Sequence, residues 1–98
     1  MHMREMIKYN GKEYLVKYRH DRIVLDIMDF NGIVVGEKTL SNGGQTTAFI
    51  TETKDGPPIL KAIAKCSKKE TFCKELGRRI SLGRLKKKIE VQNVQDNL

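Results

Sequence analysis

The stretch Ser67–Lys88, SKKETFCKELGRRISLGRLKKK, holds the clearest helical pattern in this 98-residue chain and most of its positive charge. Counted from Lys65, it carries ten Lys or Arg residues against two Glu, a net charge of +8. The remaining residues carry nine basic and ten acidic groups, a net charge of −1. The positive field of the protein therefore comes from this one segment.

The sequence of this stretch predicts an amphipathic helix that covers a sheet. Ser67 is followed three residues later by Glu70, which is the capping-box pattern, so we expect the helix to begin after an N-cap at Ser67. Apolar residues then recur at helical spacing and should pack against the sheet. This stripe consists of Phe72, Leu76, Ile80 and Gly83.

The helix also contains two glycines and a second apolar strip. Gly77 and Gly83 each cost about 1 kcal/mol relative to Ala in a helix interior, so we expect a close approach to the sheet or a partner, a bend at Gly83, or simple tolerance. A second apolar strip lies on another side of the helix. If the helix does not bend at Gly83, this strip would face another copy of the chain. This strip, the expected interface of a homodimer, consists of Leu82, Leu85 and Ile89.

The first two thirds of the chain have the pattern of three β-hairpins. The paired segments are residues 6–9 and 12–18, 23–30 and 33–40, and 45–53 and 59–66, with residues 19–22 expected as a polar turn. Asn10-Gly11 and Asn31-Gly32 separate the first two pairs, and Asn-Gly favours a type I′ turn because both central residues need positive φ. The second hairpin is apolar on both faces near its turn, so we expect its strands to be central.

These elements predict an α+β fold, in which an antiparallel β-meander of five or six strands is covered on one face by the C-terminal basic helix. We expect one domain over residues 1–90 and a flexible tail over 91–98. The alternating small residues Ala62 and Ala64 would leave room for a close helix.

Residues that carry catalytic chemistry are sparse. Cys66 and Cys73 are separated by six residues, which matches no zinc or redox spacing, and no enzyme motif is present. Asp26 would lie opposite Glu37 in the second hairpin, where solvated carboxylates are favoured over a metal or acid/base pair. We therefore expect no enzyme activity, cofactor or metal. No apolar run could span a membrane and no signal peptide is evident, so we expect a cytoplasmic protein.

The charge of the helix points to an anionic partner. DNA or RNA, bound through its phosphates, is the first hypothesis, and an acidic surface of a host protein bound by the same helix face is the alternative. The predicted phosphate contacts are Lys68, Lys69, Lys74, Arg78, Arg84, Lys87 and Lys88.

Residues 64–84, AKCSKKETFCKELGRRISLGR, resemble the ending of many small uncharacterised phage and mobile-element proteins. The shared features are a strand, a short polar turn, an aromatic residue, and then Gly77-Arg78 with Arg84 about a turn and a half later. Thr71 departs from the pattern at a position where an acidic residue is usual. The resemblance covers roughly a quarter of the chain. It implies a phage or prophage origin and action inside a bacterium, and it implies no activity and no site residue.

Overall fold

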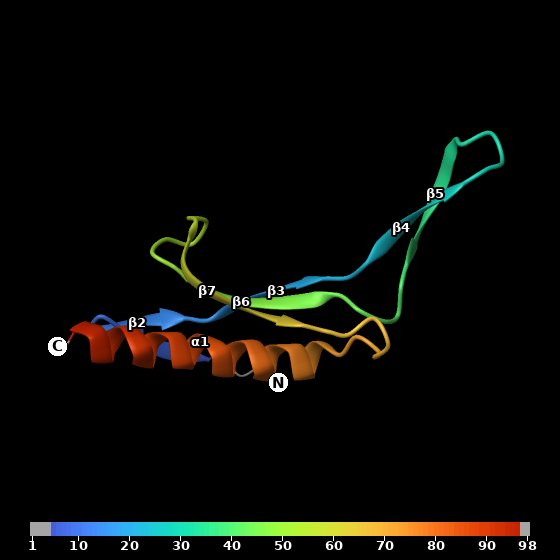
Figure 1. The fold of residues 1–98 in the computed structure, drawn as a ribbon. Coiled ribbons are helices and arrows are strands. Elements are labelled where there is room, and N and C mark those ends of the chain that lie inside the picture. The colour runs from blue at the N-terminus through green and yellow to red at the C-terminus, as the bar shows by residue number, and fades with distance from the viewer. Residues whose placement is uncertain (1–4, 97–98) are drawn as a thin grey trace.

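The computed structural model describes residues 5–96, which form seven strands and one helix. The strands form three antiparallel sheets, β1-β2, β3-β6-β7 and β4-β5, and the helix lies across one face of the three-stranded sheet (Figure 1). The predicted α+β class is therefore confirmed, although the strands do not form a single meander. The elements are β1 (Met6–Tyr9), β2 (Lys12–Leu15), β3 (Lys17–Asp21), β4 (Val24–Met28), β5 (Val34–Thr39), β6 (Gln45–Thr51), β7 (Pro58–Lys65) and α1 (Lys74–Asp96).

The first hairpin has the predicted turn and register. Asn10 and Gly11 both have positive φ, 52° and 78°, and Ile7 pairs with Tyr14. The second predicted strand, residues 12–18, is divided in the structure. Val16 separates β2 from β3, and β3 pairs with β6 and not with β1. Residues 19–22 were therefore wrongly predicted as a turn, since β3 continues through Asp21.

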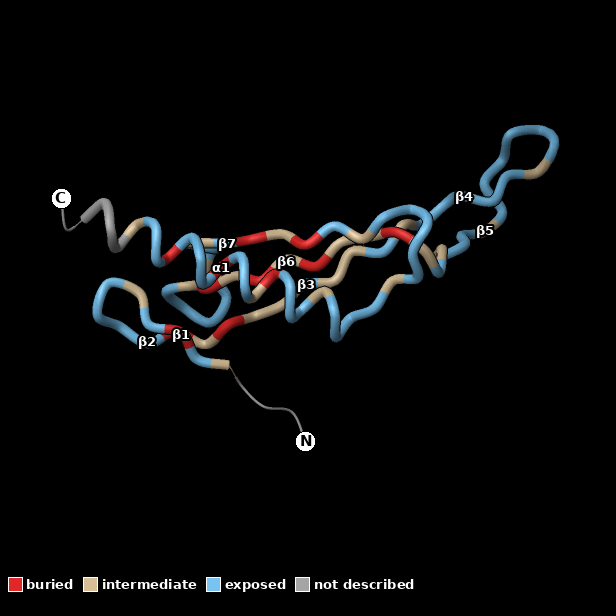
Figure 2. Tube along the Cα trace, turned by 60° about the horizontal axis from the view of Figure 1, so that its bottom comes forward, coloured by how far each residue is buried: buried red, intermediate tan, exposed pale blue. Residues whose placement is uncertain are grey.

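The helix packs on the β6–β7 hairpin through small side chains. Thr46 and Ala48 of β6 and Ala62 and Ala64 of β7 are buried on the face that α1 covers. Buried residues concentrate in these strands, in the first hairpin and in the helix, as Figure 2 shows. The third hairpin and its small-residue face are thus confirmed. The core consists of Ile7, Tyr14, Val16, Ala48, Ile50, Ala62, Leu85 and Ile89.

This core corrects the predicted burial of the helix. Leu85 and Ile89 are 0% and 5% exposed within a single copy of the chain, and Leu82 packs against the same cluster. The three residues therefore do not form a free strip for a dimer interface. Leu76 and Ile80, predicted to be buried, are instead 45% and 39% exposed.

The helix begins later than predicted, at Lys74, and it buries the side that carries Gly77, Ser81 and Leu85. Ser67 stabilises a local turn: its carbonyl accepts from the Glu70 amide (3.0 Å), and its Oγ accepts from the Lys69 amide (3.2 Å). The Phe72 amide then donates to the Ser41 carbonyl at 2.8 Å. These bonds occupy the backbone groups that a helix from Ser67 would have used.

The helix also runs further than expected, through Asp96. Residues 91–96, expected to belong to a flexible tail, are helical, and residues 97–98 lie outside the described part. The Tyr9 hydroxyl donates to Gln92 Oε1 at 2.6 Å, which joins this end of the helix to the first hairpin.

The second hairpin, predicted to be central, is instead an arm that projects from the body (Figures 1 and 2). The arm comprises residues 24–39, and its strands contact only each other to any extent. Its register pairs Asp26 with Glu37, as predicted. The arm makes the molecule elongated, with a radius of gyration of 17.3 Å, against about 13 Å for a compact chain of this length.

The tip of the arm differs from the predicted two-residue turn. Gly32 has a positive φ of 81°, but Asn31 does not adopt a positive φ, so a type I′ turn does not form there. The Asp29 carboxylate instead accepts from the amides of Asn31 and Ile33 at 2.9 and 3.0 Å. This wider loop accompanies a shift of register, in which Met28 pairs with Val34.

The two helix glycines are predicted to respond oppositely to Ala. A Cβ on Gly77 would overlap the Thr46 hydroxyl and lie 2.9 Å from Thr46 Cβ, whereas one on Gly83 would meet nothing within 4 Å. Gly83→Ala should therefore raise the free energy of unfolding by about 1 kcal/mol, the propensity difference, and Gly77→Ala should lower it. Denaturant unfolding measures both. Equal effects would contradict the close approach at Gly77.

Leu85→Asp is expected to unfold the chain, because it places a carboxylate where the native side chain is fully buried. Circular dichroism of the variant checks this. A folded Leu85→Asp protein would contradict the packing of the helix described above.

Candidate nucleic-acid interface

Arg84 and Lys88 lie along the open edge of β7. This strand pairs with β6 alone, so its other edge presents main-chain carbonyls. Arg84 Nη1 donates to the Ile63 carbonyl at 2.7 Å, and Lys88 Nζ donates to the Lys61 carbonyl at 2.6 Å. Charged side chains that cover the edge of a sheet block its pairing with another strand. The two cations therefore have a structural role as well as the predicted binding role.

A groove opens between α1 and this edge of β7. Its volume is about 550 Å³, and the side chains around it are basic or apolar apart from one amide. Arg84 and Lys88 each use one donor on β7, which leaves further N–H donors for an anion. The lining residues are Leu60, Arg84, Lys87, Lys88, Val91 and Gln92.

Lys74 and Arg78 lie on a different side of the helix, within electrostatic range of His20 on β3. His20 Nδ1 is hydrogen-bonded to Thr46 Oγ1 (2.8 Å), and its ring packs edge-on against Phe72, with centroids 5.9 Å apart. Burial, followed by the positive charges of Arg78 and Lys74, lowers the pKa of His20 below its ordinary value of 6.5. These two cations therefore act on β3 and not on the groove.

The predicted phosphate contacts thus fall into three groups. Arg84, Lys87 and Lys88 converge on the α1–β7 groove. Lys74 and Arg78 are on the β3 side, whereas Lys68 and Lys69 are exposed in the turn before the helix. The sequence could not separate these groups, because the separation depends on where the helix begins and on which strand has the free edge.

Little of the positive charge on the helix is neutralised within the protein. Among the side chains that the structure describes, α1 makes one ion pair, Arg79 with Glu75 at 3.8 Å, and both partners are more than 70% exposed. Exposed pairs of this kind contribute little free energy and are screened by salt. The helix therefore presents an almost uncompensated positive surface to solvent.

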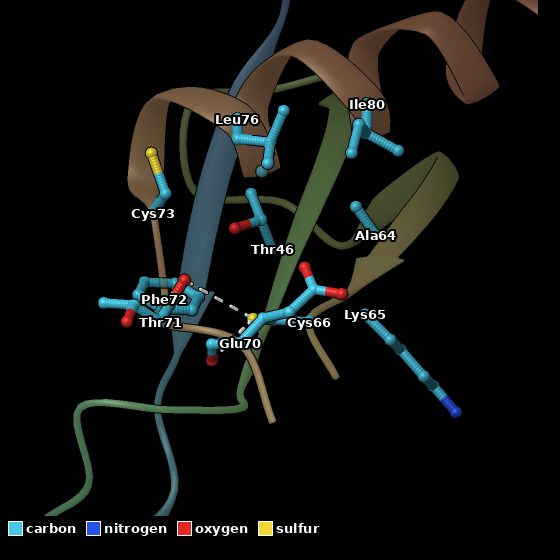
Figure 3. Close-up of a pocket in the computed structure, with 11 residues that line it drawn as sticks. Thr46, Ala64, Lys65, Cys66, Glu70, Thr71, Phe72, Cys73, Leu76 and Ile80 are labelled. Atoms are coloured by element: carbon cyan, nitrogen blue, oxygen red, sulfur yellow. Dashed lines mark hydrogen bonds between the residues drawn. The ribbon is translucent and has the colours of Figure 1, made fainter. Parts of the chain in front are cut away.

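A small cavity of about 60 Å³ lies beside the first turns of the helix (Figure 3). Cys66 and Cys73 both line it, and both thiols are free. The Cys66 thiol contacts the carbonyls of Ser67, Glu70 and Thr71 at 3.4–3.7 Å, so it helps to hold the turn. Among the side chains of residues 5–92, no three His, Cys, Asp or Glu come together as a metal site.

No family model, no curated protein and no solved structure matches this chain. The helix, as far as the structure describes it, lacks the length of apolar sequence needed to cross a membrane.

The lowered pKa of His20 predicts a pH-dependent stability. Between its folded pKa and 6.5, the unfolded chain binds a proton that the folded chain does not, so the free energy of unfolding falls as the pH drops below about 6.5. Urea titrations between about pH 5 and 7 should show this loss in a His2→Gln background, where His20 is the sole imidazole, and a flatter profile once His20→Gln is added. An NMR titration that places the His20 pKa above 6.5 would contradict the burial of the ring.

Proposed function

We propose that this chain is a small non-catalytic nucleic-acid-binding protein of phage or prophage origin, acting inside a bacterial cell. Arg84, Lys87 and Lys88 in the α1–β7 groove make the central phosphate contacts. The α1–β7 groove is the observation that carries this proposal. Three cations of one helix line it, and its lining contains no acidic residue.

The dimensions of the helix fit a phosphate backbone. Arg84, Lys87 and Lys88 lie within about 6 Å of one another along the helix axis at 1.5 Å per residue, which is less than two base-pair steps of 3.4 Å. Lysine and arginine contacts to phosphates position a protein on nucleic acid without reading its sequence. The arrangement therefore supports binding with little sequence preference, in which Lys68, Lys69, Lys74 and Arg78 add attraction from the flanks.

An acidic host-protein surface is the second candidate, and the exposed apolar residues of the helix favour it. Leu76 and Ile80 are 45% and 39% exposed among the cations of α1. Protein interfaces depend on apolar or aromatic anchors within a polar rim, whereas phosphate tracking does not need them. Capture from bacterial lysate with and without nuclease separates the candidates, because a protein partner survives the nuclease.

The nucleic-acid proposal predicts a steep dependence of affinity on salt. About four neutralised phosphates give a slope of log affinity against log salt near −3 to −4, and removing three contacts should reduce its magnitude by about 2.7. Fluorescence anisotropy with a labelled duplex and a labelled single strand measures this slope for the wild type and for Arg84→Gln/Lys87→Gln/Lys88→Gln.

A control variant with the same change in net charge keeps the test specific. Lys8→Gln/Lys38→Gln/Lys54→Gln removes three exposed lysines from strands and a loop outside the helix. It should keep a slope within about one unit of the wild type. Equal losses in the two variants would show that total charge, and not the groove, governs binding. Absence of binding to any DNA or RNA at low salt would overturn the proposed function.

A further inference from the structure

The arm, residues 24–39, exposes more apolar surface than a monomer of this size ordinarily does. Eight of its large apolar side chains are at least 45% exposed, and Phe30 at the tip is 98% exposed. They lie on both faces of the two strands, so each face of the arm has an uncovered apolar surface, and exposed apolar patches of this kind mark interaction sites. These residues are Val24, Leu25, Ile27, Met28, Phe30, Ile33, Val34 and Val35.

The arm is also poorly stabilised as an isolated element. A two-stranded hairpin without a third strand or a covering helix is at best marginally stable in water. In addition, Asp26 lies directly opposite Glu37, and like charges at cross-strand positions destabilise a hairpin. A partner with an apolar surface would cover the exposed strands, and its positive charge would relieve the repulsion between Asp26 and Glu37.

We propose that the arm docks on the exposed face of helix α1 of a second copy of this chain, and that the second arm docks reciprocally. That helix face offers Leu76 and Ile80 for the apolar side chains, and Arg79, with Lys86 two turns later, for the carboxylates of the arm. The arm has three acidic residues and one lysine, whereas residues 65–88 carry a net charge of +8. Oppositely charged surfaces steer and orient such contacts.

The charges of the arm favour this partner over two others. Two arms packed through the face that carries Asp26 and Glu37 would bring these carboxylate pairs together without a cation between them. A nucleic acid would repel the arm for the same reason, since phosphates and carboxylates share their sign. The proposed contact uses none of the residues that line the α1–β7 groove, and it is tested in nuclease-treated samples, so it stands or fails independently of the proposed function.

Charge exchange between two variants tests the contact. The arm-reversed variant is Asp26→Lys/Glu37→Lys, and the helix-reversed variant is Arg79→Glu/Lys86→Glu. In nuclease-treated samples, each variant alone should dimerise more than about tenfold more weakly than the wild type, because like charges then face each other. An equimolar mixture should regain the dimer, since both contacts in a mixed pair again join opposite charges. Sedimentation equilibrium measures the dissociation constants.

Two control variants distinguish this contact from a general effect of net charge and from loss of the fold. Lys54→Glu/Lys61→Glu makes the same change in net charge away from the exposed helix face and should dimerise as the wild type does. Val24→Ser/Met28→Ser should weaken the dimer and leave the thermal unfolding of the body unchanged, because both side chains lie on the face of β4 that carries Asp26 and neither belongs to the core.

The proposal fails if the wild type is monomeric at about 100 μM, where a complex of micromolar affinity is almost fully formed. It also fails if the helix-reversed variant dimerises normally, which would point to pairing of arm with arm. A mixture that stays monomeric would likewise overturn the reciprocal arrangement.

Discussion

The close contact between Gly77 and Thr46 is the constraint on which the arrangement of this protein depends. Because Gly77 has no side chain, the helix backbone approaches β6 closely. The buried Ser81 and the small residues of β7 extend this contact into a closely packed seam between the helix and the sheet. Ser81 Oγ donates to the Gly77 carbonyl at 2.7 Å, so its hydroxyl is satisfied within the helix. This seam fixes the rotation of α1, and the rotation decides which of its cations reach the edge of β7.

The edge of β7 connects the fold to the proposed binding role. An open edge is a liability, and the chain covers it with Arg84 and Lys88. Because the carbonyls hold these side chains in place, the two cations are positioned before any partner arrives. Pre-ordered side chains lose less conformational entropy on binding. In the proposed function, the two residues that protect the edge are therefore also the ones that contact phosphates.

The sequence predicted the features that depend on local rules and missed those that depend on long-range pairing. The type I′ turn at Asn10-Gly11 and the α+β class followed from turn chemistry and alternation, whereas Asp26 pairs with Glu37 although the turn assumed at Asn31-Gly32 does not form. The helix start at Lys74 did not, because residues 41–43 compete for the backbone of the segment before it. The contact of Gly77 with Thr46 was missed as well, and it is this contact that buries Leu85, exposes Leu76 and divides the predicted phosphate contacts.

The arm shows why two-sided apolar strands can mislead. Strands buried on both faces and strands that await a partner have the same sequence pattern, because both end up covered on two sides. Such a pattern shows that apolar residues occupy both faces of a strand, but it does not show whether another element of the same chain covers them. The carboxylates of the arm help to distinguish the two cases, since a central strand would have to bury Asp26 and Glu37 in apolar surroundings at a large free-energy cost. Strands that are apolar but carry opposed acidic residues are therefore better explained as an interface with a basic partner than as the middle of a sheet.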